Sequence, residues 1–136
     1  MTLTEVYTEI DNNGVDVYYF PMESNAKGLA FPDGCIVMDT DKIENEIEEK
    51  ETAYHEWAHI KTGSFYNLYS PFDIKAKQEK RALKETIINL IPLDDFMEAI
   101  NSGITEVWEL AELFEVSEEL MLKAMKRYYN VVKGIG

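Results

Sequence analysis

The spacing of apolar residues near the N-terminus predicts a helix. From Leu3 to Ile10 they recur every three or four positions, as on one face of an amphipathic helix. Thr2 and Glu5 have the spacing of a capping box, which marks the first turn of a helix. The run Asn12-Asn13-Gly14 favours termination. We therefore expect a short N-terminal helix that packs on the structure following it.

Three short segments then show strand patterns. Residues 15–19 alternate between apolar and polar side chains, and residues 28–31 and 35–38 are short apolar runs. Pro32-Asp33-Gly34 separates the last two and has turn composition, so they are expected to form a hairpin. Strands this short need a helix on one face to be stable.

A long helical pattern follows the strands. No Pro or Gly occurs from Thr40 to Thr62, and acidic residues line the early turns, near the positive end of a helix dipole. Asp41 and Glu44 predict the start of this helix, and Gly63 is placed to end it.

The rest of the chain reads as helices. Ser70 as cap and Pro71 at the first position predict a helix that runs until Pro92. Shorter helices are expected after Asp94-Asp95, from Glu106 and after Ser117. The predicted fold is α+β: an N-terminal helix, a small three-stranded sheet, two long helices and a C-terminal helical part. We place a core domain at residues 1–92 and a helical extension, packed on that core, at 93–136.

The charge of the chain narrows the classes of partner. Its 13 basic and 26 acidic residues give a net charge of −13. Nucleic-acid binding is disfavoured, because phosphate contacts need clustered Lys and Arg. The surplus acid either keeps the protein soluble and monomeric or forms an acidic face for a basic protein partner.

The sequence also predicts a cytoplasmic protein that makes no membrane contact. No apolar run approaches the ~20 residues that span a bilayer, and the N-terminus lacks the features of a signal peptide. Cys35 is the only cysteine, so an internal disulfide is impossible.

The candidate chemistry lies in the first long helix. His55-Glu56-Trp57-Ala58-His59 has the His-Glu-x-x-His pattern and contains both histidines of the chain. Residues four apart share a helix face, so both imidazoles can bind one metal ion. Glu56 then lies where a general base can reach a water on that metal, as in zinc hydrolases.

A catalytic zinc site usually needs a third protein ligand. With no further histidine, the candidates on the following helix are Asp73, Glu79 and Glu85, and Cys35 is a weaker one. Composition alone does not choose among them, because a lone carboxylate on a helix is most often a solvated charge.

A wider pattern resembles the ImmA/IrrE metallopeptidase family, in particular its short phage- and mobile-element-encoded members. The motifs are Gly28 in a strand, the His55–His59 motif, Gly63-Ser64-Phe65-Tyr66 with Tyr69-Ser70-Pro71, and Glu79-x-x-Ala82 before Leu90-Ile91-Pro92. They cover roughly residues 15–92. The sequence departs from the family where Ala58 replaces a frequent Gly and where Glu85-Thr86 replaces an aromatic-Ala pair.

The resemblance implies a zincin-like core in which Glu79 is the third zinc ligand. It also implies an endopeptidase that cleaves a helix-turn-helix repressor and so acts as an anti-repressor for a prophage or mobile element. Two competing hypotheses stay open: a non-enzymatic regulator that binds the repressor and keeps the metal for folding, and a peptidase with another target, such as a toxin-antitoxin component or a stress regulator.

Two further roles also stay open. Tyr66 and Tyr69 are either stabilisers of a tetrahedral intermediate or aromatic residues that pack the loop. The strand at 28–31, or its hairpin partner at 35–38, is a candidate sheet edge for an extended peptide substrate.

Overall fold

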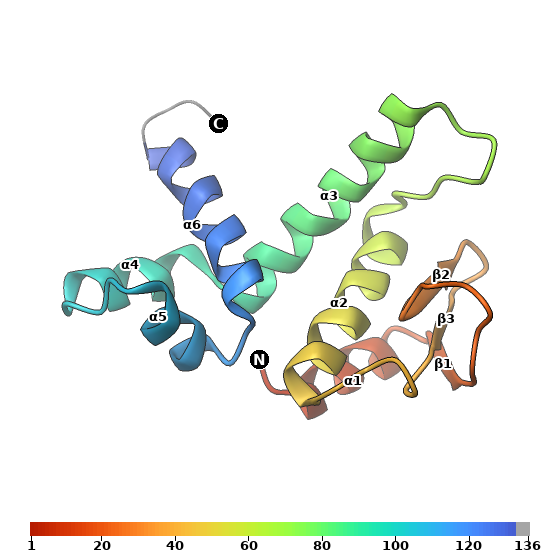
Figure 1. Cartoon of the computed structure of the whole chain (residues 1–136), viewed down its shortest axis with the longest axis horizontal. Coiled ribbons are helices and arrows are strands. Elements are labelled where there is room, and N and C mark those ends of the chain that lie inside the picture. Colours follow the sequence, from red (N-terminus) through yellow and green to blue (C-terminus); the bar gives the residue numbers. More distant parts are fainter. Residues whose placement is uncertain (133–136) are drawn as a thin grey trace. The chain divides into compact units, whose positions relative to one another are not determined.

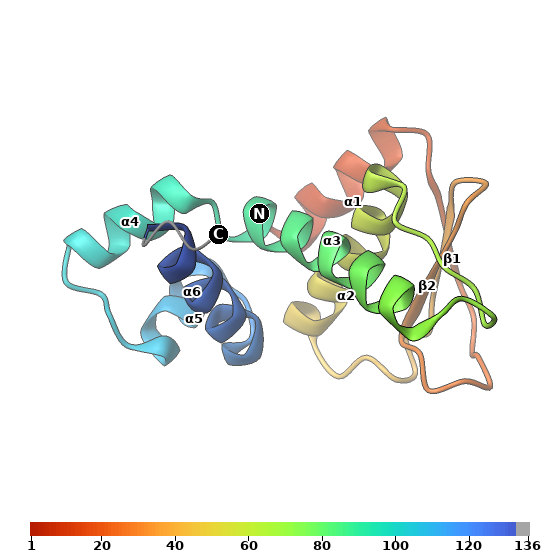
Figure 2. The same ribbon diagram turned by 90° about the horizontal axis from the view of Figure 1, so that it is seen from above.

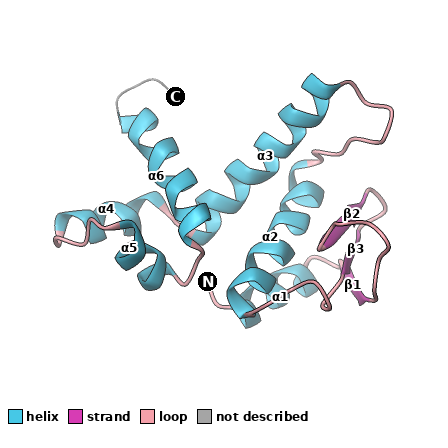
Figure 3. Ribbon diagram, in the orientation of Figure 1, coloured by secondary structure: helices cyan, strands magenta, loops and turns pink. Residues whose placement is uncertain are grey.

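A computed structural model describes residues 1–132 of the chain. Its helices and strands confirm the predicted α+β class and are shown in Figures 1 and 3. In chain order they are α1 (Leu3–Asn12), β1 (Asp16–Tyr19), β2 (Gly28–Phe31), β3 (Cys35–Met38), α2 (Glu46–Thr62), α3 (Phe72–Leu90), α4 (Leu93–Asn101), α5 (Val107–Phe114) and α6 (Glu118–Val132). No helix among the described residues combines the length and apolar character needed to cross a membrane.

The sheet has three strands in the order β1-β3-β2. β2 and β3 form the predicted antiparallel hairpin, with Gly28 opposite Met38 and Phe31 opposite Cys35. β1 pairs in parallel with β3, from Asp16 opposite Cys35 to Tyr19 opposite Met38. The central strand is therefore β3, and its residues Ile36, Val37 and Met38 are all buried. β1 and β2 are the two edge strands.

The N-terminal helix packs on α2, beside which it lies in Figures 1 and 2. Its capping box is present: the Glu5 amide donates to the Thr2 hydroxyl, and the Thr2 amide donates to the Glu5 carboxylate. The buried residues Val6 and Ile10 supply its apolar face. Two hydrogen bonds join the helices, from the Tyr7 hydroxyl to Glu49 (2.8 Å) and from the Trp57 indole to Glu9 (2.6 Å).

The start predicted for α2 was wrong. The helix begins at Glu46, after an N-cap at Asn45 whose side chain accepts from the Glu48 amide. The preceding residues are held outside the helix because Lys42 donates to the Met22 carbonyl and pairs with the buried Asp39 at 2.8 Å. The predicted end is confirmed: Gly63 has φ 64°, a left-handed conformation that favours glycine.

The later helices lie where the sequence placed them, but their caps differ. The hydroxyl of Ser70, the predicted cap of α3, accepts instead from the Asn67 amide. α4 starts at Leu93, so Asp94 and Asp95 lie in its first turn, and α5 begins after Glu106 without a side-chain cap. Only the cap of α6 matches, since the Leu120 amide donates to the Ser117 hydroxyl.

Contacts between residues divide the chain into two compact units, Met1–Thr86 and Ile87–Gly136. The first contains α1, the sheet, α2 and most of α3. In the second, the Tyr128 ring packs on Phe96, with centroids 5.3 Å apart, and its hydroxyl donates to the Ile91 carbonyl. The domain boundary after Pro92 and the packing of the C-terminal part on the core stay predictions.

Candidate metal centre

One turn of α2 presents both histidines on the same side. His55 and His59 are four residues apart, and their Nε2 atoms lie 3.2 Å from each other. The rings meet edge to face, with centroids 4.8 Å apart. This is the juxtaposition that the helical period of 3.6 residues dictates for positions i and i+4.

The third group comes from α3. Glu79 directs Oε2 to His55 Nε2 at 3.0 Å and Oε1 to His59 Nε2 at 3.2 Å. The potential ligand atoms of the three residues all lie within 4.8 Å of one another. His55, His59 and Glu79 can therefore hold a metal ion between the two helices.

The backbone after α2 fixes the orientation of His59. Its Nδ1 lies 2.6 Å from the Ser64 carbonyl oxygen, to which an Nδ1–H can donate, and this leaves Nε2 facing Glu79 and His55. Ser64 is fully buried and follows the left-handed Gly63. The sequence pattern did not predict this role of Ser64. Its position, directly after the glycine that ends the helix and five residues beyond His59, is the signal that could have indicated the contact.

Hydrogen bonds keep Glu79 ionised. The two histidines, first His55 and then His59, lower the pKa of its carboxyl well below the usual range, although burial acts in the opposite direction. Tyr66 contributes as well, since its hydroxyl donates to Glu79 Oε1 at 2.6 Å. The same hydrogen bond is the main reason why the pKa of Tyr66 rises to about 12, so Tyr66 is a neutral donor at physiological pH.

Glu56 lies beside the three potential ligands but is not one of them. Its side chain is buried, at 8% exposure, and this burial raises the pKa of its carboxyl. The charges of His55 and His59 act in the opposite direction, towards a lower pKa. A carboxylate with a raised pKa next to a candidate metal site is typical of a general base.

Strand β2 touches the same region. A Cβ atom at Gly28 would lie 2.9 Å from Thr52 Cγ2, closer than real Cβ contacts, and 3.0 Å from Glu56 Cγ, which is tighter than most of them. The glycine thus allows the edge strand to approach α2 at the position of Glu56. A glycine at the start of a strand pattern was the sequence signal for this close approach.

The other candidates lie away from the three groups. Tyr69 is 91% exposed, whereas Tyr66 contacts Glu79. Glu85 forms an ion pair with Lys61 at 3.1 Å, Asp73 is exposed in the first turn of α3, and Cys35 lies on β3. Of the two strands considered as a substrate edge, β3 is the central strand, so that alternative is wrong, and β2 is an edge.

Neither protein-family models nor curated proteins give a match to this chain.

Proposed function

We propose that this protein is a zinc-dependent endopeptidase of the ImmA/IrrE type. The observation that carries the proposal is the convergence of His55, His59 and Glu79 from two helices, with the buried Glu56 beside them. Two imidazoles and one carboxylate are a donor set of catalytic zinc sites, which keep one coordination position for water or substrate.

The distances are compatible with a zinc ion. Bonds of about 2.0–2.1 Å at tetrahedral angles separate neighbouring ligand atoms by about 3.3 Å. The distances between the facing atoms of the two histidines and Glu79 are 3.0, 3.2 and 3.2 Å. The hydrogen bond from His59 to the Ser64 carbonyl is the kind of outer contact that orients a metal-binding histidine.

Each residue then has a defined part in peptide hydrolysis. When bound, zinc supplies Lewis acidity that polarises the scissile carbonyl and makes water more acidic. Glu56 accepts a proton from the attacking water on its carboxylate and donates it to the amide nitrogen that leaves. Tyr66, a neutral donor that is hydrogen-bonded to Glu79, would stabilise the developing negative charge, whereas Tyr69 lacks a comparable contact.

Strand β2 is the proposed substrate edge. It is an outer strand of the sheet, lies against α2 and passes Glu56 at Gly28. An extended peptide paired with its free main-chain groups would run past the catalytic carboxylate. Because residue 28 is a glycine, no side chain lies between β2 and Glu56 at this position.

By its resemblance to short phage and mobile-element proteins, we assign the protein a cytoplasmic anti-repressor role. The substrate would be a helix-turn-helix repressor, whose DNA-binding surface is basic. The net charge of −13 suits such a partner and disfavours direct DNA binding. Cleavage would relieve repression of the prophage or mobile element.

The test is incubation of the zinc-loaded protein with the repressor encoded beside its gene, with fragments detected by mass spectrometry. We expect cleavage by the wild type and by Glu46→Gln, a matched change at the exposed start of α2, but none by Glu56→Gln. Equal cleavage by Glu56→Gln would exclude its role as base. Release of intact repressor from its operator by both the wild type and Glu56→Gln would support a non-enzymatic regulator instead.

A further inference from the structure

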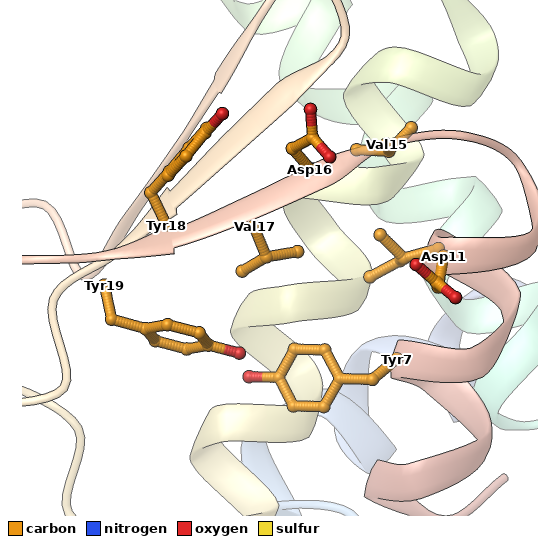
Figure 4. A pocket seen from close by; sticks show the side chains of 8 residues that line it. Tyr7, Asp11, Val15, Asp16, Val17, Tyr18 and Tyr19 are labelled. Carbon is orange, nitrogen blue, oxygen red and sulfur yellow. The ribbon is translucent and has the colours of Figure 1, made fainter.

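A second site lies between α1 and β1, apart from the metal ligands. It is a cavity of about 420 Å³ lined by eight residues, all from these two elements and the turn between them. Figure 4 shows Tyr7 and Asp11 on the helix side and Val17 and Tyr19 on the strand side. None of the residues assigned to the metal site lines it.

Aromatic side chains form much of its wall. The rings of Tyr7 and Tyr19 meet edge to face, with centroids 6.4 Å apart, and their hydroxyls point toward one another. Tyr7 is anchored by its 2.8 Å hydrogen bond to Glu49. Tyr18, Tyr19 and Phe20 are 51–52% exposed, so half the surface of three successive aromatic residues is available for contact.

The charge of the cavity is negative and unbalanced. Asp11 and Asp16 line it, whereas no Lys or Arg does. Within residues 1–132, neither carboxylate takes part in an ion pair. Figure 4 shows Asp11 on the same side of β1 as Tyr7 and Tyr19, whereas Asp16 lies on the other face of the strand. A cation entering beside Val17 would meet tyrosine rings and the Asp11 carboxylate together, a combination that suits the planar guanidinium of arginine.

Main-chain groups are available at the same place. β1 is an edge strand whose inner side pairs with β3. The Phe20 amide donates to the Met38 carbonyl, so residues 16 and 18 also turn their amides and carbonyls toward β3. By the alternation of a strand, Val17 and Tyr19 turn theirs outward, where another strand can pair with them.

We propose that β1 and this cavity form a docking site for an extended, arginine- or lysine-bearing segment of a protein partner. The segment pairs with the outer edge of β1 and places its cationic side chain among Tyr7, Tyr19 and Asp11. This inference does not depend on the metal or on peptidase activity.

The charges favour this occupant over two others. A second copy of the chain would bring its own β1, which carries Asp16 and no cation. Nucleic acid would place phosphates against the two carboxylates, which repel them. A basic protein segment is the occupant that satisfies both the free edge and the unpaired acids.

The probe is a synthetic peptide of about ten residues, with alternating Thr and Val around one arginine. Its control has citrulline, a neutral group of the same shape, in place of arginine. Binding to the full chain carrying Glu56→Gln, which prevents cleavage, is followed by NMR. We expect the arginine peptide to bind about fivefold more tightly or better, and to shift the amide signals of residues 17–19.

Two variants test whether the preference for the arginine peptide arises in this cavity. Asp11→Asn should abolish the preference for arginine, whereas Asp73→Asn, an exposed aspartate outside the cavity, should retain it. Equal affinity for both peptides, or shifts confined to residues outside α1 and β1, would overturn the proposal. Self-association that Tyr19→Lys abolishes in sedimentation velocity would also overturn it, in favour of a second copy.

Discussion

Gly28 and Glu56 lie so close that an added Cβ at residue 28 would be 3.0 Å from Glu56 Cγ. We therefore predict that Gly28→Ala displaces the carboxylate or moves β2 away from α2. Turnover should fall by about 10²-fold, the usual effect of misplacing a catalytic group by about 1 Å. Zinc content should not change, because neither residue is a ligand. Full activity of Gly28→Ala would show that this contact does not matter for catalysis.

A second prediction concerns the end of α2. Gly63 has φ 64° with open space around it, so Gly63→Ala costs only backbone strain, about 1–2 kcal/mol of folding stability. Because Ser64 follows directly and its carbonyl orients His59, zinc affinity should also fall, by about tenfold or more. Calorimetric zinc titration and urea unfolding measure the two effects.

Gly14→Ala is the matched control for this change. Gly14 has φ 73°, also in open space, and follows α1 far from the ligands in sequence. The Gly14→Ala protein should lose about as much folding stability as the Gly63→Ala protein and keep the zinc affinity of the wild type. Equal zinc affinity of the Gly63→Ala protein and the wild type would mean that the Ser64 carbonyl does not orient the histidine.

The two tyrosines after α2 should respond differently to loss of their hydroxyls. Tyr66 donates to Glu79 at 2.6 Å, whereas Tyr69 is 91% exposed. Tyr66→Phe should lower turnover by about tenfold or more, and Tyr69→Phe should leave it unchanged. Steady-state assays on one peptide measure both. Unchanged turnover in both variants would remove Tyr66 from the catalytic site.

Asp39 makes the stability of the first unit depend on pH. Lys42 and the amides of Met22 and Asp41 donate to its carboxylate, and they hold its pKa below the ordinary value of 3.8. A carboxyl whose folded pKa is lowered stabilises the fold above its unfolded pKa, and this contribution is lost as the pH falls through the folded pKa.

Asp39→Asn should therefore be less stable than the wild type in urea unfolding at pH 7, and the difference should shrink progressively below pH 3.8. Asp41→Asn, a change at an exposed aspartate, serves as control and should be as stable as the wild type at pH 7 and at pH 3. A difference for Asp39→Asn that is constant from pH 7 to pH 3 would contradict the ion-pair account.

Much of the fold follows from local signals. The capping box of α1, the hairpin turn at 32–34 and the glycine that ends α2 each act over a few residues, and the structure shows all three. The start of α2 was missed because Asp41 and Glu44 have capping-box spacing, yet Lys42 is held by Asp39 and the Met22 carbonyl. Such a tertiary contact is not visible in a local pattern.

The candidate site likewise follows partly from local spacing and partly from tertiary contacts. Spacing alone placed His55 and His59 on one helix face, but it left Asp73, Glu79 and Glu85 open as candidates on α3. Only the family resemblance chose Glu79. The structure brings Glu79 to the histidines and directs Glu85 to Lys61. The contact of β2 with Glu56 and the position of β3 in the middle of the sheet depend on strand order, which residue spacing does not encode.

Zinc binding by Glu79→Ala beside Glu85→Ala tests the central claim most directly. Both changes remove a glutamate from α3, but only Glu79 faces the histidines. Metal-free protein is titrated with zinc in a calorimeter, and bound metal is counted by elemental analysis. We predict about one zinc ion per chain for the wild type and for Glu85→Ala, and an affinity reduced by more than about a hundredfold for Glu79→Ala. Equal zinc affinity in all three proteins would contradict the three-ligand site.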